Sequence, residues 1–180
     1  MTPRKRVYDL IIAFSELIKQ NNDFHLHIAG GQHPAYGDYY AAIEHIVNKL
    51  NLRDRVTFYG NVTENWNWYH NIDIFISNGY SEGLQVAPME AMASGCYCLA
   101  HRWDGAEELL PEENLYYTNN ELLEKILDYC DRPAAEKQME REHMRDIASN
   151  KFDINQTLFH IRGVLEDVSL SYMSKDGTGN

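Results

Sequence analysis

The sequence has few cysteines, no long apolar run and fewer basic than acidic residues. Its three cysteines, Cys96, Cys98 and Cys130, are an odd number, which argues against a disulfide framework. Cys96 and Cys98 lie two residues apart on an expected strand and are too close along the chain for an ordinary disulfide. We therefore expect three reduced thiols in a cytoplasmic protein and consider metal ligation by them the less favoured alternative.

The charge balance and the absence of long apolar segments exclude further classes. Sixteen basic and 27 acidic residues give a formal net charge of −11, whereas nucleic-acid binding needs a basic surface. We expect no nucleic-acid partner. No apolar run approaches the length that spans a membrane, and the first residues show no signal-peptide pattern.

The composition is that of one globular domain. Of the 180 residues, 44% are hydrophobic, which is enough for a sizeable core. We expect a domain over residues 1–173 and a frayed polar tail over residues 174–180.

Apolar patterning predicts strands that alternate with helices. The expected strands cover residues 24–29, 56–59, 72–76, 97–100 and 115–117. The expected helices cover residues 7–18, 40–50, 106–110, 120–130, 134–149 and 155–170. Alternation of this kind predicts an α/β fold, a Rossmann-like parallel sheet with helices on both faces.

The central stretch of the chain is residues 77–95. It follows the buried strand expected at residues 72–76, begins with a turn of small and polar residues, and continues into a short helix that ends at Gly95. Ligands of open α/β sheets bind at the carboxyl ends of the strands. The amino terminus of a helix there offers free backbone N–H groups to a phosphate.

Two carboxylates flank this turn, Glu82 in the loop and Glu90 within the helix, with seven residues between them. Either one alone is most simply a charge that favours the helix dipole or faces solvent. Glu90 lies among Ala and Met, where a carboxylate needs hydrogen-bond donors. Both residues together, at this spacing, favour a site that binds the hydroxyls of a ribose or a sugar.

Ring side chains elsewhere in the sequence leave alternatives open. Trp66, Trp68 and Tyr69 could stack on a base or a sugar, but packing of a helix on the sheet is favoured. His25 and His27 could ligate a metal, but histidines satisfied on one sheet face are favoured.

The segments Ser81-Glu82-Gly83 and Glu90-Ala91-Met92-Ala93-Ser94-Gly95 resemble the signature of retaining glycosyltransferases of the GT-B fold, family 4, also called glycosyl transferases group 1. These enzymes use nucleotide-sugars and have two Rossmann-like domains. The resemblance covers about residues 5–127 and implies the carboxyl-terminal, nucleotide-sugar-binding domain.

The resemblance also implies roles for individual residues. Glu82 would lie near the transferred sugar, and Lys5 would neutralise the diphosphate leaving group. A simpler reading of Lys5, a basic residue in a frayed terminus, remains open. The remaining nucleotide-sugar contacts would come from Gly83, Leu84 and Gln85 (sugar and phosphate), Glu90 (ribose), Gly30 and Gly31 (cleft loop), and Gly60, Asn61 and Val62 (base). No Asp-x-Asp motif is present, so we expect neither a metal nor another cofactor.

Two departures from the family pattern matter. The family has a strand that precedes the lysine and ends in an arginine, and the chain starts too late to contain it. That strand would be central, so we expect a fragment whose sheet closes the gap or is completed by another chain, which makes self-association an open possibility. The amino-terminal GT-B domain is absent too, and the Trp103–Ala106 loop has fewer glycines than the family.

These observations predict the donor-binding domain of a retaining glycosyltransferase. It would move a sugar from a UDP- or GDP-type nucleotide-sugar to an unknown sugar, lipid or protein acceptor, and the fragment alone would be inactive. The complete enzyme would be cytoplasmic or peripheral to the inner face of a membrane. The alternatives are a non-catalytic nucleotide-sugar-binding or interaction module and a UDP-sugar epimerase of the same fold.

Overall fold

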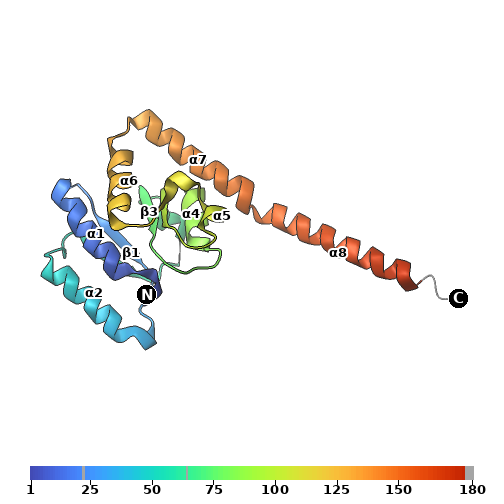
Figure 1. Ribbon diagram of the computed structural model, residues 1–180, viewed down its shortest axis with the longest axis horizontal. Coiled ribbons are helices and arrows are strands. Elements are labelled where there is room, and N and C mark those ends of the chain that lie inside the picture. Colours follow the sequence, from blue (N-terminus) through green and yellow to red (C-terminus); the bar gives the residue numbers. More distant parts are fainter. Residues whose placement is uncertain (22, 64, 177–180) are drawn as a thin grey trace.

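The computed structural model describes residues 1–21, 23–63 and 65–176. Figure 1 shows a body of helices around short strands, from which the last helix projects. The helices are α1 (Val7–Gln20), α2 (Gly37–Lys49), α3 (Asn65–Tyr69), α4 (Val86–Ala93), α5 (Ala106–Leu109), α6 (Asn119–Asp131), α7 (Ala134–Phe152) and α8 (Ile154–Asp176). Short 3₁₀ helices cover Pro3–Lys5, Pro34–Tyr36 and Glu112–Asn114.

The strands form two parallel sheets. The first contains β1 (Leu26–Ala29) and β2 (Val56–Gly60). In the second, β4 (Tyr97–His101) lies between β3 (Ile74–Ser77) and β5 (Leu115–Tyr116). The predicted parallel α/β fold is therefore confirmed, and every expected strand is present with small shifts at its ends.

Helices cover both faces of the second sheet, as predicted. Successive side chains of a strand point to opposite faces. Accordingly, Tyr97 and Leu99 of β4 pack in a core with α1, α2 and α6, whereas Cys98 and Ala100 pack with α4, α5 and α7. Both cores thus share β4, which is buried along nearly all of its length.

A cavity of about 900 Å³ lies between the two sheets. Among the described residues, β1 pairs only with β2 and β3 only with β4, so no strand ladder joins the sheets. The cavity is mostly apolar, and six of its lining side chains are Leu10, Phe14, Leu17, Ile28, Ile74 and Ile76. The gap that the sequence led us to expect is present, and it has not been closed by pairing of β1 with β3.

The chain ends in α8, which extends away from the body (Figure 1). Seven of its apolar side chains are exposed: Ile154, Leu158, Phe159, Ile161, Val164, Leu165 and Val168. Ser174–Asp176, expected to be frayed, belong to this helix, and residues 177–180 of the expected tail lie outside the described residues. Within the described ranges, α8 and the other helices are all too short or too polar to cross a membrane.

Candidate functional site

The loops that follow β1 and β2 are joined by hydrogen bonds. The Gly30 amide donates to the Gly60 carbonyl at 2.7 Å, and the Gly31 amide donates to Asn61 Oδ1 at 2.7 Å. Gly30 and Gly60 have φ values of +121° and +63°, which favour glycine. Four of the predicted site residues therefore form one edge of the site.

Glu82 and Lys5, the two predicted catalytic residues, form an ion pair. Lys5 Nζ lies 2.8 Å from Glu82 Oε1, and the side chains are 51% and 10% exposed, respectively. Lys5 belongs to the 3₁₀ helix Pro3–Lys5, so it is not a residue of an unstructured terminus. A half-exposed cation and a largely buried carboxylate thus meet at the carboxyl end of β3.

The first turn of α4 follows Glu82 closely in the chain and begins with exposed residues. Gln85 is the N-cap residue, and no side chain caps the helix. Leu84 and Val86 are both 63% exposed. An uncapped helix start with exposed neighbours is suited to an anion. Gly95 ends the helical segment with φ of +84°, as predicted.

Glu90 lies one turn further along α4 and is partly buried. The Tyr69 hydroxyl donates a hydrogen bond to Glu90 Oε2 at 3.3 Å. Burial and the neighbouring Glu90 raise the pKa of Tyr69, which keeps the phenol protonated at ordinary pH. The simpler alternative, a glutamate that only faces solvent, is therefore wrong.

Gln85 connects the site to the cavity between the sheets. Its Oε1 accepts a hydrogen bond from Ser77 Oγ at 2.5 Å, and its Nε2 is buried without a partner among the described residues. Lys5, Gly30, Val62 and Gln85 line the same cavity. The cavity therefore opens between the elements that carry the predicted site residues.

Asn78, which is 5% exposed, was not among the site residues predicted from the sequence. Its Oδ1 accepts a hydrogen bond from the Tyr116 hydroxyl at 2.7 Å, and its Nδ2 donates to the Arg6 carbonyl at 3.0 Å. The Tyr80 amide adds a contact to the Arg4 carbonyl at 3.4 Å. These bonds hold the segment that carries Lys5 against the central loop. The position of this asparagine, directly after a buried strand, is the sequence feature that could have indicated its role.

His25, directly before β1, and His27, within β1, both have hydrogen-bond partners on β2, as favoured from the sequence. His25 Nε2 lies 2.8 Å from Thr57 Oγ1, and His27 Nδ1 lies 2.7 Å from the Tyr59 hydroxyl. Within the described part of the chain, no three His, Cys, Asp or Glu side chains are grouped so as to hold a metal.

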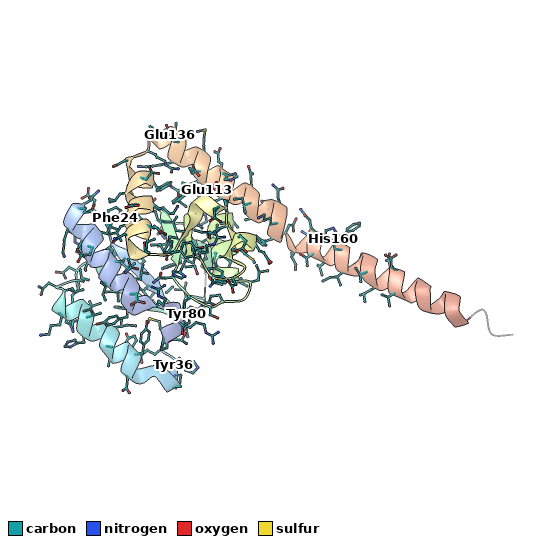
Figure 2. All side chains as sticks on the ribbon, viewed as in Figure 1. Phe24, Tyr36, Tyr80, Glu113, Glu136 and His160 are labelled. Atoms are coloured by element: carbon teal, nitrogen blue, oxygen red, sulfur yellow. The ribbon has the colours of Figure 1, made fainter. Side chains whose placement is uncertain are left out.

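Two of the three aromatic residues around α3 pack, and one does not. Tyr69 is 5% exposed and Trp68 is half-buried, whereas Trp66 is 62% exposed. Tyr80, in the central loop, is also exposed at 56%, and Figure 2 shows it at the surface of the body. Packing therefore accounts for Trp68 and Tyr69 but not for Trp66.

Curated proteins similar to this chain are glycosyltransferases. The chain is 24% identical over 180 aligned residues to alpha-monoglucosyldiacylglycerol synthase of Streptococcus pneumoniae, with 97% of the chain and 40% of the relative covered. It is 27% identical over 150 residues to tRNA-queuosine alpha-mannosyltransferase of Drosophila melanogaster, with coverage of 82% and 38%. The chain thus spans about two-fifths of the length of these relatives.

Solved structures show the same fold. Anabaena HepE in complex with UDP and glucose superposes with a TM-score of 0.83 at 22% identity, over 93% of this chain and 46% of that one. The C-terminal domain of the glycosyl transferase group 1 protein LpcC from Francisella tularensis gives a TM-score of 0.75 at 22% identity, over 86% and 83%. The model of the family "Glycosyl transferases group 1" matches residues 1–148. The chain therefore belongs to the glycosyl transferases group 1 family and has the fold of a GT-B carboxyl-terminal domain.

Proposed function

We propose that this chain is the donor-binding domain of a retaining glycosyltransferase that uses a UDP- or GDP-type nucleotide-sugar. The arrangement of Lys5, Glu82 and the start of α4 carries the proposal. A cation, a largely buried carboxylate and free backbone N–H groups converge at the carboxyl ends of parallel strands. The binding of UDP by the structural neighbour HepE supports a nucleotide ligand of this kind.

Each group has a chemical task in this proposal. The diphosphate lies at the uncapped start of α4, where N–H groups and the helix dipole favour negative charge. Lys5 stabilises the charge that develops on the diphosphate as the glycosidic bond breaks. Glu82 lies beside the transferred sugar and Glu90 accepts hydrogen bonds from the ribose, while the Gly60–Asn61–Val62 turn borders the base.

A thermal-shift panel of UDP, GDP, ADP and their common sugars is the first test. Binding to the native state raises the melting temperature in proportion to the logarithm of ligand concentration over Kd. We expect a selective upward shift with one nucleotide, which identifies the base. If no nucleoside diphosphate shifts the melting temperature or gives heat in calorimetry, the chain is not a donor-binding domain and the non-catalytic module is the better reading.

Glu90→Gln tests the ribose role against a matched control. The substitution keeps the shape of the side chain but removes its charge, so we expect about tenfold weaker nucleotide binding. Glu107→Gln, an exposed glutamate on α5, should leave binding unchanged. Equal affinity in Glu90→Gln and the unaltered chain would show that Glu90 does not contact the ribose.

The stereochemical and metal aspects of the proposal concern the complete enzyme. With retention, NMR of the first product formed shows the anomeric configuration of the donor sugar; an inverted anomer would contradict the proposal.

Because Lys5 supplies the positive charge at the diphosphate, transfer should persist in the presence of EDTA. Loss of transfer on chelation, restored by a divalent cation, would show that a metal is needed.

A further inference from the structure

Tyr69, the last residue of α3, contacts the Glu90 carboxylate and is packed on several sides. Its ring lies edge-on to Trp68 and Phe75, with centroid distances of 5.3 and 5.8 Å. Its backbone carbonyl accepts a hydrogen bond from the Cys96 thiol at 3.4 Å. With both its backbone and its ring contacted on several sides, Tyr69 presents its hydroxyl in one direction, toward Glu90 Oε2.

The helix that carries Tyr69 also lies between the two sheets of the molecule. Trp68 contacts Tyr59 of β2 edge-on at 5.9 Å, whereas Tyr69 contacts Phe75 of β3. The position of the Tyr69 hydroxyl therefore depends on packing with both sheets. Because no strand ladder joins these sheets in the described residues, α3 is one of the elements that set their relative position.

A carboxylate recognises a pair of neighbouring hydroxyls only if its plane is fixed, because hydrogen bonds to its oxygens are directional. A hydrogen bond from a buried phenol to one oxygen restricts the rotation of that plane. The short helix α4 places Glu90 in the fold, and the hydrogen bond from Tyr69 holds one oxygen of its carboxylate.

We propose that Tyr69 is a positioning residue for ribose recognition: its hydroxyl orients the Glu90 carboxylate so that it accepts the ribose hydroxyls of the nucleotide. This inference rests on the proposed function, since it concerns the ribose contact of the same site. It assigns to an aromatic residue, whose ring packs in the core, a task in discriminating ribonucleotides from nucleotides that lack ribose hydroxyls.

The test compares the binding of UDP and 2′,3′-dideoxy-UDP by titration calorimetry, with the nucleotide panel above deciding whether GDP or ADP replaces UDP. The unaltered chain should prefer the ribonucleotide. Tyr69→Phe keeps the ring but removes the donor, so we expect the preference to fall about tenfold while affinity for the dideoxy form stays the same. Tyr97→Phe is the control, because Tyr97 is equally buried but stacks on Tyr129 in the other core.

A double-mutant cycle with Glu90→Gln separates positioning from general damage to the site. If Tyr69 acts through Glu90, adding Tyr69→Phe to Glu90→Gln should not lower the preference further. A full preference retained in Tyr69→Phe overturns the inference while leaving the donor site intact. Equal weakening of both nucleotides by Tyr69→Phe overturns it as well, since it indicates a structural role. Failure of the unaltered chain to bind any ribonucleotide overturns the proposed function and the inference together.

Discussion

Gly79 lies directly under the side chain of Glu82. A Cβ atom added at Gly79 would come within 2.9 Å of Glu82 Cγ, closer than real Cβ contacts, so the glutamate would have to move. We predict that Gly79→Ala displaces Glu82 from Lys5 and weakens binding of UDP-glucose about tenfold more than binding of UDP. Calorimetry with both ligands measures this difference.

The control for Gly79 is Gly37, at the start of α2. It has an ordinary helical φ of −56°, and a Cβ there would meet open space. Gly37→Ala should leave both affinities unchanged. Equal affinities in Gly79→Ala and Gly37→Ala would mean that the position of Glu82 does not matter for the sugar.

The buried thiol of Cys96 makes the free energy of unfolding fall as the pH rises through the alkaline range. Burial raises the pKa of its thiol from about 9 to about 11. Because the folded pKa lies above the unfolded one, this contribution is fully present below pH 9 and is lost as the pH rises toward 11. Between pH 8 and pH 10.5 we expect Cys96 to account for a loss of about 2 kcal/mol in the free energy of unfolding.

Urea unfolding at the two pH values, on the unaltered chain and on Cys96→Ala, measures this loss. The variant should show a weaker pH dependence, whereas Cys130→Ala, which removes a half-buried thiol, should keep most of it. The same dependence in Cys96→Ala and the unaltered chain would assign the alkaline loss to other groups, such as Tyr97, whose pKa burial raises to about 12.

The sequence indicated the charged residues of the candidate site but not the residues that contact them. Glu82 and Glu90 are visible because their spacing is local and forms a signature. Gly79, Asn78 and Tyr69 act through contacts with side chains or segments that only the folded chain brings near. For Tyr69 the apolar pattern correctly predicted packing, and its hydrogen bond to Glu90 had no signal in the sequence.

At the scale of elements, the joint between α4 and β4 depends on Gly95. Its φ is +84°, and its carbonyl accepts a hydrogen bond from Arg141 Nε of α7 at 2.8 Å. A Cβ there would also collide with the Arg145 guanidinium. We predict that Gly95→Ala lowers the free energy of unfolding by about 1–3 kcal/mol, as measured by urea unfolding.

Gly163 in α8 is the matched glycine in a regular helix with open space around it. Alanine there should increase the helicity at 222 nm without changing the urea midpoint of the body, because alanine favours helix. An unchanged midpoint in Gly95→Ala, like that in Gly163→Ala, would mean that the joint relaxes freely.

The sequence predicted the elements well because each has a local cause. Apolar runs followed by glycine or polar residues marked the strands, and spacing of three and four residues marked α1, α2 and α6. The ends differ by a few residues: α2 begins at Gly37, and β1 begins at Leu26. Which strands pair is a long-range property, so the division into a two-stranded and a three-stranded sheet required the structure.

At the scale of the molecule, α8 adds surface but little core. Figure 2 shows His160 on a stretch of α8 whose side chains stand clear of the body. We predict that a chain ending at Phe152 keeps the melting temperature of the body within about 2 °C, since few contacts are removed. Differential scanning calorimetry of both chains tests this, and a fall of more than about 5 °C would show that α8 supports the body.

The two sheets are followed by different halves of the candidate site: Gly30 and Gly60 lie at the ends of β1 and β2, whereas Glu82 and Glu90 lie in the loop and helix that follow β3. In the described residues no strand ladder joins the sheets, so folding cooperativity between them rests on side-chain packing in the core that they share with α1, α2 and α6. A nucleotide that contacts both halves would act as a cross-link. We predict that unfolding followed by two probes, one in each half, gives separate transitions without nucleotide and a single transition with it, so that a bound nucleotide makes this domain unfold as one unit.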